Sequence, residues 1–481
     1  MNNVAHSDIE RLRDGIDAAW EEARKFGLDP FPTHFELVPA SIMYEFASYS
    51  LPGRFSHWTH GKAFYRQKMQ YDLGLSKIYE MVVNTNPSYA FLMDMNNLLQ
   101  NTFVAAHVFG HTDFFKNNAY FQHTSRRMID KVSIHAERIA KYEFDHGKDE
   151  VERYLDAVLS IQEHIDYNLL LNKEESVDAE EGGKTPSTEF DDIWGLEDRA
   201  KKAEEERERK SGKPPKFPEK PEKDLLLFLI HHSPHLEPWQ RDVIEIVRTE
   251  MLYFIPQMQT KVMNEGWASI WHSRIMRQLG DRGVITDSET VEFAQLHSGV
   301  LTPSRTSLNP YYIGFKIFED IERRWDNPTR EEQDRLGRKP GQGKQKIFEV
   351  RELDNDVSFL RNYLTEDLVK DLDLYLYKKE GDEWVIAEKN WQKVRDTIVA
   401  NMTNFGHPYL VVDNGDYHGN RELYLTHLFE GQELDLNYAE KTLQHVYMLW
   451  GRPVHLETVY EGKRILLTYD GERNSKSTLE K

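Results

Sequence analysis

The chain has 481 residues, more than one hydrophobic core usually organises, so the sequence predicts two or more domains. Hydrophobic residues make up 39% and aromatic residues 12% of the chain, which excludes disorder throughout. The formal charge of -20 repels phosphate backbones and anionic lipid, and the basic residues at 207–216 are interleaved with Glu, so we expect no nucleic-acid partner.

The sequence contains no cysteine, which excludes disulfides, thiolate metal sites and cysteine nucleophiles. Residues 1–8 lack the basic segment and apolar run of a secretory signal. The longest apolar run, 225–230, is far shorter than the roughly 20 residues of a membrane-spanning helix. We therefore expect a cytoplasmic location and no membrane insertion.

The spacing of apolar residues over 1–326 predicts a mostly helical domain with a short strand at 78–83. The expected helices span 8–28, 94–115, 124–146, 149–170, 238–254, 258–278, 288–298 and 310–324. The helix at 94–115 is apolar nearly all round, which predicts that it is buried. Residues 172–223 combine charge runs with a proline tract and are predicted to form a solvated insertion.

A polar stretch at 327–346 predicts an interdomain linker, and the pattern changes after it. Strand-like runs are expected at 347–351, 372–377, 383–386, 409–412, 422–427, 454–459 and 464–469, with helices at 390–402 and 436–449. The predicted fold class is α+β. It combines a large, mostly helical N-terminal domain with a smaller α+β C-terminal domain at 347–470 and a tail at 471–481.

The strongest candidate for chemistry is a histidine pair in the buried helix. His107 and His111 are one helical turn apart, so both rings lie on one face and can point at one metal ion. A buried imidazole needs partners for its nitrogens. The alternative interpretation is a pair of core histidines with ordinary hydrogen-bond partners.

A second helix supplies a carboxylate and another imidazole. Glu265 and His272 are seven residues apart and return to nearly the same face after two turns, beside the small Gly266 and Ala268. Two imidazoles and one carboxylate are the ligand set of catalytic zinc sites that leave a position open for water. The prediction is a divalent-metal site made of His107, His111 and Glu265, with His272 as a fourth ligand or an outer partner; zinc is expected, and iron and manganese are alternatives.

The sequence departs from the His-Glu-x-x-His zinc hydrolases at one position, because Val108 follows His107 where those enzymes carry their general base. Candidate catalytic residues are therefore sought elsewhere. Glu250 and Glu137 are candidates for the base, and His297 and Tyr312 could donate hydrogen bonds to an oxyanion. Each has the alternative interpretation of an ordinary surface or helix-end residue.

Three classes of function remain open on this pattern. The first is a zinc-dependent, gluzincin-like hydrolase of amide bonds that lacks the usual Glu after the first His. The second is a regulatory or scaffold protein whose His-Glu cluster is structural. The third is a non-haem metal oxidoreductase, which needs a redox-active ion.

Several stretches together resemble the stage V sporulation protein R (SpoVR-like) family of bacteria. They are 107–118, which begins His-Val-Phe-Gly-His; 260–268, which contains Asn-Glu-Gly-Trp-Ala; 296–300; and, for the C-terminal domain, 405–408 and 423–458. The resemblance covers nearly the whole chain outside 172–223. It implies a cytoplasmic role in spore cortex formation, or in stress response and cell-envelope physiology, and a functional link to a serine protein kinase of the PrkA type.

Overall fold

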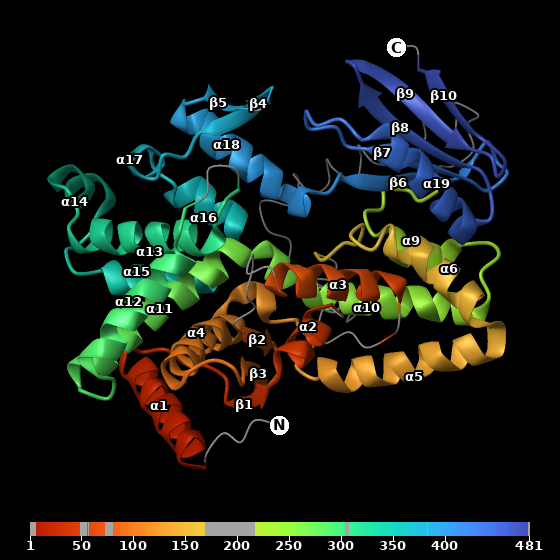
Figure 1. Cartoon of the computed structure of the whole chain (residues 1–481). Coiled ribbons are helices and arrows are strands. Elements are labelled where there is room, and N and C mark those ends of the chain that lie inside the picture. Colours follow the sequence, from red (N-terminus) through yellow and green to blue (C-terminus); the bar gives the residue numbers. More distant parts are fainter. Residues whose placement is uncertain are drawn as a thin grey trace, which may run out of the picture. The chain divides into compact units, whose positions relative to one another are not determined.

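The computed structural model describes residues 6–48, 55, 57–72, 80–168, 217–303, 307–381 and 383–479. The chain divides into two compact units (Figure 1). The first unit is formed by Met1–Arg138 and Tyr253–Gly406, and the second by Ile139–Leu252 and His407–Lys481. Helices α5 (Met128–His146) and α10 (Pro238–Gln259) each contain a boundary between the units.

The first unit is mostly helical. Its helices are α1 (His6–Lys25), α2 (Ala40–Ser48), α3 (Trp58–Asp72), α4 (Leu98–Asn117), η1 (Ala119–Phe121), α11 (Lys261–Asp281), α12 (Asp287–Val300), α13 (Pro310–Asp326), α14 (Arg330–Leu336), α15 (Gly343–Leu353), α16 (Asp356–Tyr363), α17 (Glu366–Asp371), α18 (Trp391–Met402) and η2 (Thr403–Gly406). One continuous hydrophobic core joins residues of α1, α4, α11, α13 and α15 to α18. The predicted helical N-terminal part is therefore confirmed.

Two small sheets belong to the same unit. The first contains β1 (Thr33–Val38), β2 (Glu80–Val83) and β3 (Ser88–Met93) in the order β1-β3-β2, with β1 parallel and β2 antiparallel to β3. The strand predicted at 78–83 is thus found at Glu80–Val83, on an edge, and residues 78 and 79 lie outside the described residues. The second is a hairpin of β4 (Leu376–Glu380) and β5 (Glu383–Glu388).

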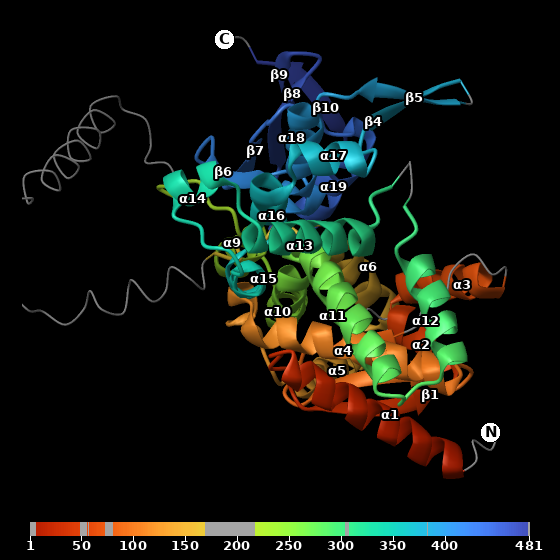
Figure 2. The ribbon, with the colours of Figure 1, turned by 90° about the vertical axis from the view of Figure 1, so that its left-hand side faces the viewer.

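Helices α4 and α11 pack against one another in the first unit (Figure 1 and Figure 2), and their backbones come very close where Gly110 meets Ala268. A Cβ added to Gly110 of α4 would lie 2.6 Å from the Cα of Ala268 on α11. On the other side of α11, a Cβ added to Gly266 would lie 2.3 Å from the backbone of Gly314 in α13. Glycine is therefore required at both positions for these helices to approach so closely.

The first turn of α11 is held by a carboxylate from another helix. Thr260, which precedes the helix, makes no side-chain cap. Instead, the buried Asp356 of α16 accepts hydrogen bonds from the backbone N–H groups of Val262 (2.8 Å) and Met263 (2.9 Å). Since these N–H groups have no partner within the helix, Asp356 fixes the end of α11 that carries Glu265.

The second unit contains a five-stranded sheet in the order β10-β9-β8-β7-β6. Its elements are α6 (Lys148–Leu159), α9 (Leu225–His232), β6 (Leu410–Tyr417), β7 (Glu422–His427), α19 (Leu436–Trp450), β8 (Val454–Tyr460), β9 (Lys463–Tyr469) and β10 (Asn474–Thr478). β7 and β8 are parallel, and the crossover between them contains α19, whose apolar side packs against the sheet. With this sheet and its helix, the predicted α+β fold class is confirmed.

Some local predictions are wrong or fall outside the described residues. The strand predicted at 347–351 is part of helix α15, where Ile347 and Val350, three residues apart, are buried against the core. Residues 327–346, expected as a linker, include α14 and the start of α15, and β10 lies in the expected tail. Most of the predicted insertion, 172–216, lies outside the described residues. None of the helices in the described part of the chain is both long and apolar enough to span a membrane.

Candidate metal centre

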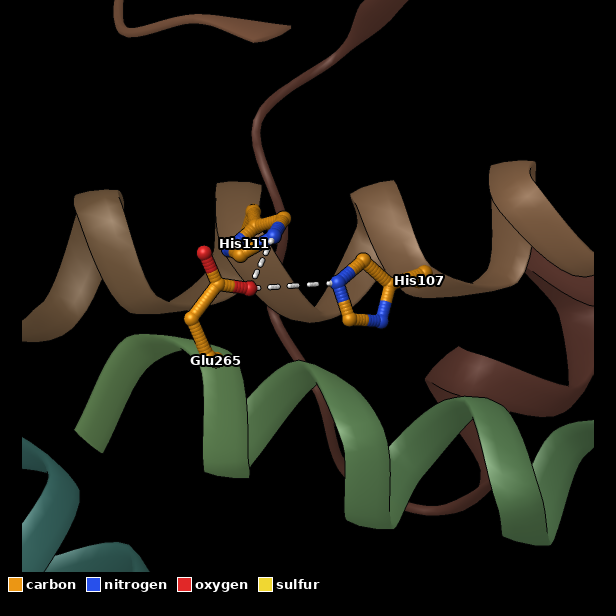
Figure 3. A group of neighbouring side chains, drawn as sticks. All are labelled: His107, His111 and Glu265. Carbon is orange, nitrogen blue, oxygen red and sulfur yellow. Dashed lines mark ion pairs between the residues drawn. The ribbon is translucent and has the colours of Figure 1, made fainter. Parts of the chain in front are cut away.

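Two imidazoles of α4 and one carboxylate of α11 meet where these helices cross. The Nε2 atoms of His107 and His111 each lie 3.5 Å from the same atom, Oε2 of Glu265. Figure 3 shows the carboxylate rising from α11 with one oxygen directed toward both rings of α4. The rings are 3% and 5% exposed, so this group lies inside the first unit. The structure therefore brings together the three residues predicted as metal ligands.

A hydrogen bond fixes which nitrogen of His111 carries its proton. Nδ1 of His111 lies 2.9 Å from Oδ1 of Asn264, which is buried on α11 directly before Glu265. An amide oxygen only accepts, so Nδ1 donates, and the Nε2 of a neutral ring holds a lone pair. That lone pair faces the carboxylate oxygen of Glu265. Asn264 was not predicted as a site residue; its only sequence signal is its place beside Glu265 in an apolar helix.

A row of imidazoles extends from His107 on the side away from Glu265. Nδ1 of His107 lies 2.8 Å from Nδ1 of His272, and Nε2 of His272 lies 2.8 Å from Nδ1 of His297 on α12. If each ring donates toward His297, the Nε2 of His107 is left with a lone pair directed at Glu265. His272 thus lies behind His107 as an outer partner, and His297 is the third ring of the row.

Burial keeps the rings of His111, His272 and His297 neutral. It lowers the pKa of His111 to about 4, with a further lowering by His107, although Glu265 and Asn264 act in the opposite direction. Burial also lowers the pKa of His297 to about 4 and that of His272 well below its ordinary value. Burial raises the pKa of Glu265, but its interactions with His107 and His111 outweigh this and leave it below the ordinary value. At pH 7 an ionised carboxylate therefore faces a neutral His111 ring.

The three ligand atoms fit a divalent ion. They all lie within 4.8 Å of one another. Two ligands at about 2.1 Å from a tetrahedral ion are roughly 3.4 Å apart, close to the two 3.5 Å separations found here. Oε2 of Glu265 is buried, and both imidazole nitrogens lie 3.5 Å from it, farther than the usual length of a hydrogen bond. His107, His111 and Glu265 could therefore hold a metal.

The other predicted site residues lie on several different elements. Glu137 is exposed on α5, and Glu250 is buried on α10 in the second unit. Tyr312 packs against the hydrophobic core. Its neighbour Tyr311, which was not predicted, stacks on the His107 ring with the ring centres 5.8 Å apart. Of the predicted catalytic residues, His297 is connected to the ligands through the hydrogen-bonded row.

Asp113, two residues past His111, anchors the same helices. Its buried carboxylate accepts hydrogen bonds from the indole N–H of Trp267 (2.8 Å) and the backbone N–H of Asp29 (2.7 Å), and Arg351 lies 3.7 Å away. Burial raises its pKa against the opposing effect of Arg351. Asp113 thus joins α4 to α11 behind the site and does not face the ligand atoms.

Comparisons with known proteins place the chain in a family. The family described as SpoVR like protein matches residues 6–407, and the SpoVR-like C-terminal domain matches residues 408–461. The chain is 29% identical over 496 aligned positions to the protein of Escherichia coli (strain K12) described as "Uncharacterized protein YcgB", with 96% of each chain covered. No solved structure matches the chain.

Proposed function

The chain belongs to the SpoVR-like family, and we propose that it is a metal-dependent hydrolase that holds zinc through His107, His111 and Glu265. Its substrates are amide bonds of peptides or of peptidoglycan-related molecules. The convergence of two imidazole nitrogens on one buried carboxylate oxygen supports this proposal above all.

The protonation state of the ligands favours an ion over a simple ion pair. The neutral His111 ring, with its proton directed at Asn264, offers no positive charge and no N–H to Glu265. Two electron-rich atoms would then face each other at 3.5 Å in an interior of low polarity. A divalent ion between them removes this repulsion, because it accepts both lone pairs.

The residues around the ligands serve the same purpose. Zinc bound here supplies a Lewis acid that activates water near neutral pH. Asn264 orients His111, and His272 orients His107, in the way that outer partners hold ligating histidines. His297 closes the row and is partly exposed, so it connects the buried rings with the surface of the first unit.

The residue after the first histidine favours a second function. Val108, fully buried in the core, stands where His-Glu-x-x-His zinc hydrolases carry their general base. A hydrolase needs a base within reach of the attacking water, whereas a structural cluster does not. A non-catalytic regulatory or scaffold protein with a structural His-Glu cluster is therefore the alternative. Iron or manganese in the same ligands would favour the third class, an oxidoreductase.

The family resemblance supports the cellular part of the proposal. We place the activity in the cytoplasm, in spore cortex formation or in stress and cell-envelope physiology, with a functional link to a serine protein kinase of the PrkA type. Peptidoglycan precursors contain amide bonds, so a hydrolase of such bonds would act in cell-envelope physiology.

Elemental analysis of the protein purified without added metal tests the site. We expect about one zinc per chain, and its loss in His111→Ala with the second unit still folded. His123→Ala removes an exposed histidine of the first unit and serves as the matched control. Full metal content in His111→Ala would contradict the ligand assignment, stoichiometric iron would favour the oxidoreductase, and a metal-free wild type would favour the scaffold.

Cleavage of amide bonds is measured separately on a mixed peptide library and on purified muropeptides, with Glu265→Gln as the control. Gln keeps the shape of Glu but removes its charge. The hydrolase proposal fails if the zinc-loaded wild type and Glu265→Gln release amines at the same background rate.

A further inference from the structure

A second group of two imidazoles and one carboxylate lies in the second unit, and none of its three residues was predicted as a site residue. It consists of His418, Glu422 and His455, whose ligand atoms lie within 4.8 Å of one another. Nδ1 of His418 is 3.0 Å and Nε2 of His455 is 2.8 Å from the same atom, Oε2 of Glu422. The two histidines are 37 residues apart in the chain, so spacing alone could not reveal the group.

The sheet places these side chains on one face. Glu422 begins β7, and Tyr424, two residues on, lies opposite His455 of β8, which in turn lies opposite Thr468 of β9. Side chains alternate along a strand, so Glu422, Tyr424, His455 and Thr468 share a face. The intervening residues, such as Leu423 and Leu425, are buried on the other face.

The turn between β6 and β7 adds the second imidazole. His418 has a φ of 61°, in the left-handed region that few non-glycine residues adopt. This backbone conformation belongs to the tight reversal after Tyr417, and the His418 side chain reaches Glu422 from it. His418 is 59% exposed, whereas Glu422 and His455 are 15% and 9% exposed, so the group is open to solvent on one side only.

Nδ1 of His455 and the second carboxylate oxygen of Glu422 have hydrogen-bond partners of the kind found around metal ligands. Nδ1 of His455 lies 2.8 Å from the hydroxyl of Thr468, which can accept the ring proton when Nε2 turns its lone pair to an ion. The other carboxylate oxygen of Glu422 accepts a hydrogen bond from the side-chain amide of Asn420 (2.8 Å), which holds the carboxylate in place. The ring of Tyr417 packs 3.9 Å from that of His418 and 5.0 Å from that of His455, measured between ring centres.

We propose that His418, Glu422 and His455 form a second site for a divalent transition-metal ion of the zinc class. Two imidazoles and a carboxylate suit zinc, cobalt and nickel better than magnesium or calcium, which prefer oxygen ligands alone. The nitrogen–oxygen distances of 2.8 and 3.0 Å are hydrogen-bond lengths, and a tetrahedral ion needs roughly 3.4 Å. The exposed His418 ring reaches the longer separation by moving outward. Its Nε2 then carries the ring proton and faces water.

The site is independent of the centre in the first unit, since it shares no residue or element with it. It faces solvent through His418, whereas His107 and His111 are buried. We therefore expect it to exchange its ion quickly and to bind it more weakly than the first site.

The test counts cobalt ions bound to the full chain after removal of metal with a chelator, by equilibrium dialysis and by the visible absorption of inner-sphere cobalt. We expect two ions for the wild type, one for His418→Asn, one for His111→Ala and none for the double variant. Asn tolerates the left-handed backbone at 418, so the turn keeps its conformation. His231→Asn, which removes an exposed histidine of α9, should still bind two.

The outcomes separate the two sites. The second site is refuted if His418→Asn binds as many ions as the wild type, or if His111→Ala binds none. Should His418→Asn change the melting temperature of the metal-free protein, Glu422→Gln replaces it as the test variant, and two ions bound by that variant also refute the site. One ion in the wild type that is lost in His418→Asn but kept in His111→Ala would support the second site and contradict the first.

Discussion

Replacing Gly110 by Ala tests whether the close contact of α4 and α11 sets the spacing of the metal ligands. The added Cβ would lie 2.6 Å from Cα and 3.1 Å from Cβ of Ala268. Carbon atoms pack at about 3.5–4.0 Å, so the two helices must separate by about 1 Å. Overpacking of this kind costs about 1–3 kcal/mol, and the better helix propensity of Ala returns at most about 1 kcal/mol. We expect a net loss of stability of about 1–2 kcal/mol.

The same displacement acts on the ligands. His107 and His111 flank Gly110 on α4, and Glu265 lies three residues before Ala268 on α11. A shift of about 1 Å widens the 3.5 Å separations to about 4.5 Å, beyond the roughly 3.4 Å that a tetrahedral ion spans. We expect zinc affinity at this site to fall at least tenfold, which corresponds to about 1.4 kcal/mol.

Zinc affinity is measured by competition with a chromogenic chelator, and stability by thermal unfolding of the metal-free protein. Gly299→Ala is the matched control, because Gly299 is exposed on α12 and a Cβ there would meet no atom within 4 Å. That variant should be as stable as the wild type or more so. If Gly110→Ala matches Gly299→Ala in both assays, helix contact does not determine the ligand spacing.

Three further changes have defined outcomes. Asn264→Ala removes the acceptor of the His111 Nδ1 proton and should weaken zinc binding by about 10- to 100-fold in the chelator assay, whereas Asn264→Asp, which keeps an acceptor, should bind nearly normally. Asp356→Ala leaves two N–H groups of α11 without their partner and should cost about 1–3 kcal/mol in thermal unfolding, with a smaller loss for Asp356→Asn. Burial lowers the pKa of His164 to about 4 in the folded protein, so between pH 6.5 and pH 4 the unfolded chain binds a proton on this ring and the folded protein does not. The free energy of unfolding should therefore fall from pH 6.5 toward pH 4, by at most about 1.4 kcal/mol per pH unit for this residue. The melting temperature of His164→Gln should fall less steeply over the same range.

The histidine pair was predictable because its geometry is local. An offset of four residues in a helix places two rings on one face whatever the helix packs against. The sequence could predict that Glu265 is a suitable metal ligand but could not locate its carboxylate, since its location depends on where α11 packs against α4. The crossing is set by Gly110 and Ala268, and small residues indicate close packing without indicating which helix is the partner.

The remaining differences between the predictions and the structure have the same origin. Tyr311 and Tyr312 are adjacent at the start of α13 and point about 100° apart, so the tyrosine that stacks on His107 depends on how α13 is rotated. Close packing of Gly266 on Gly314 sets that rotation. The run at 347–351 is a short apolar segment, and such segments suit strands and helices equally until their packing is known. Packing of Ile347 and Val350 in the core of the first unit favours the helix.

The residue after the first histidine explains why metal binding and hydrolysis require separate experiments. Val108 is fully buried in the hydrophobic core and carries no group that could accept a proton. Helix α4 therefore supplies two ligands but no base at the position where His-Glu-x-x-His zinc hydrolases carry one. If zinc is bound stoichiometrically and removed by His111→Ala, while the zinc-loaded wild type cleaves no amide bond in either substrate set, the centre is a structural one.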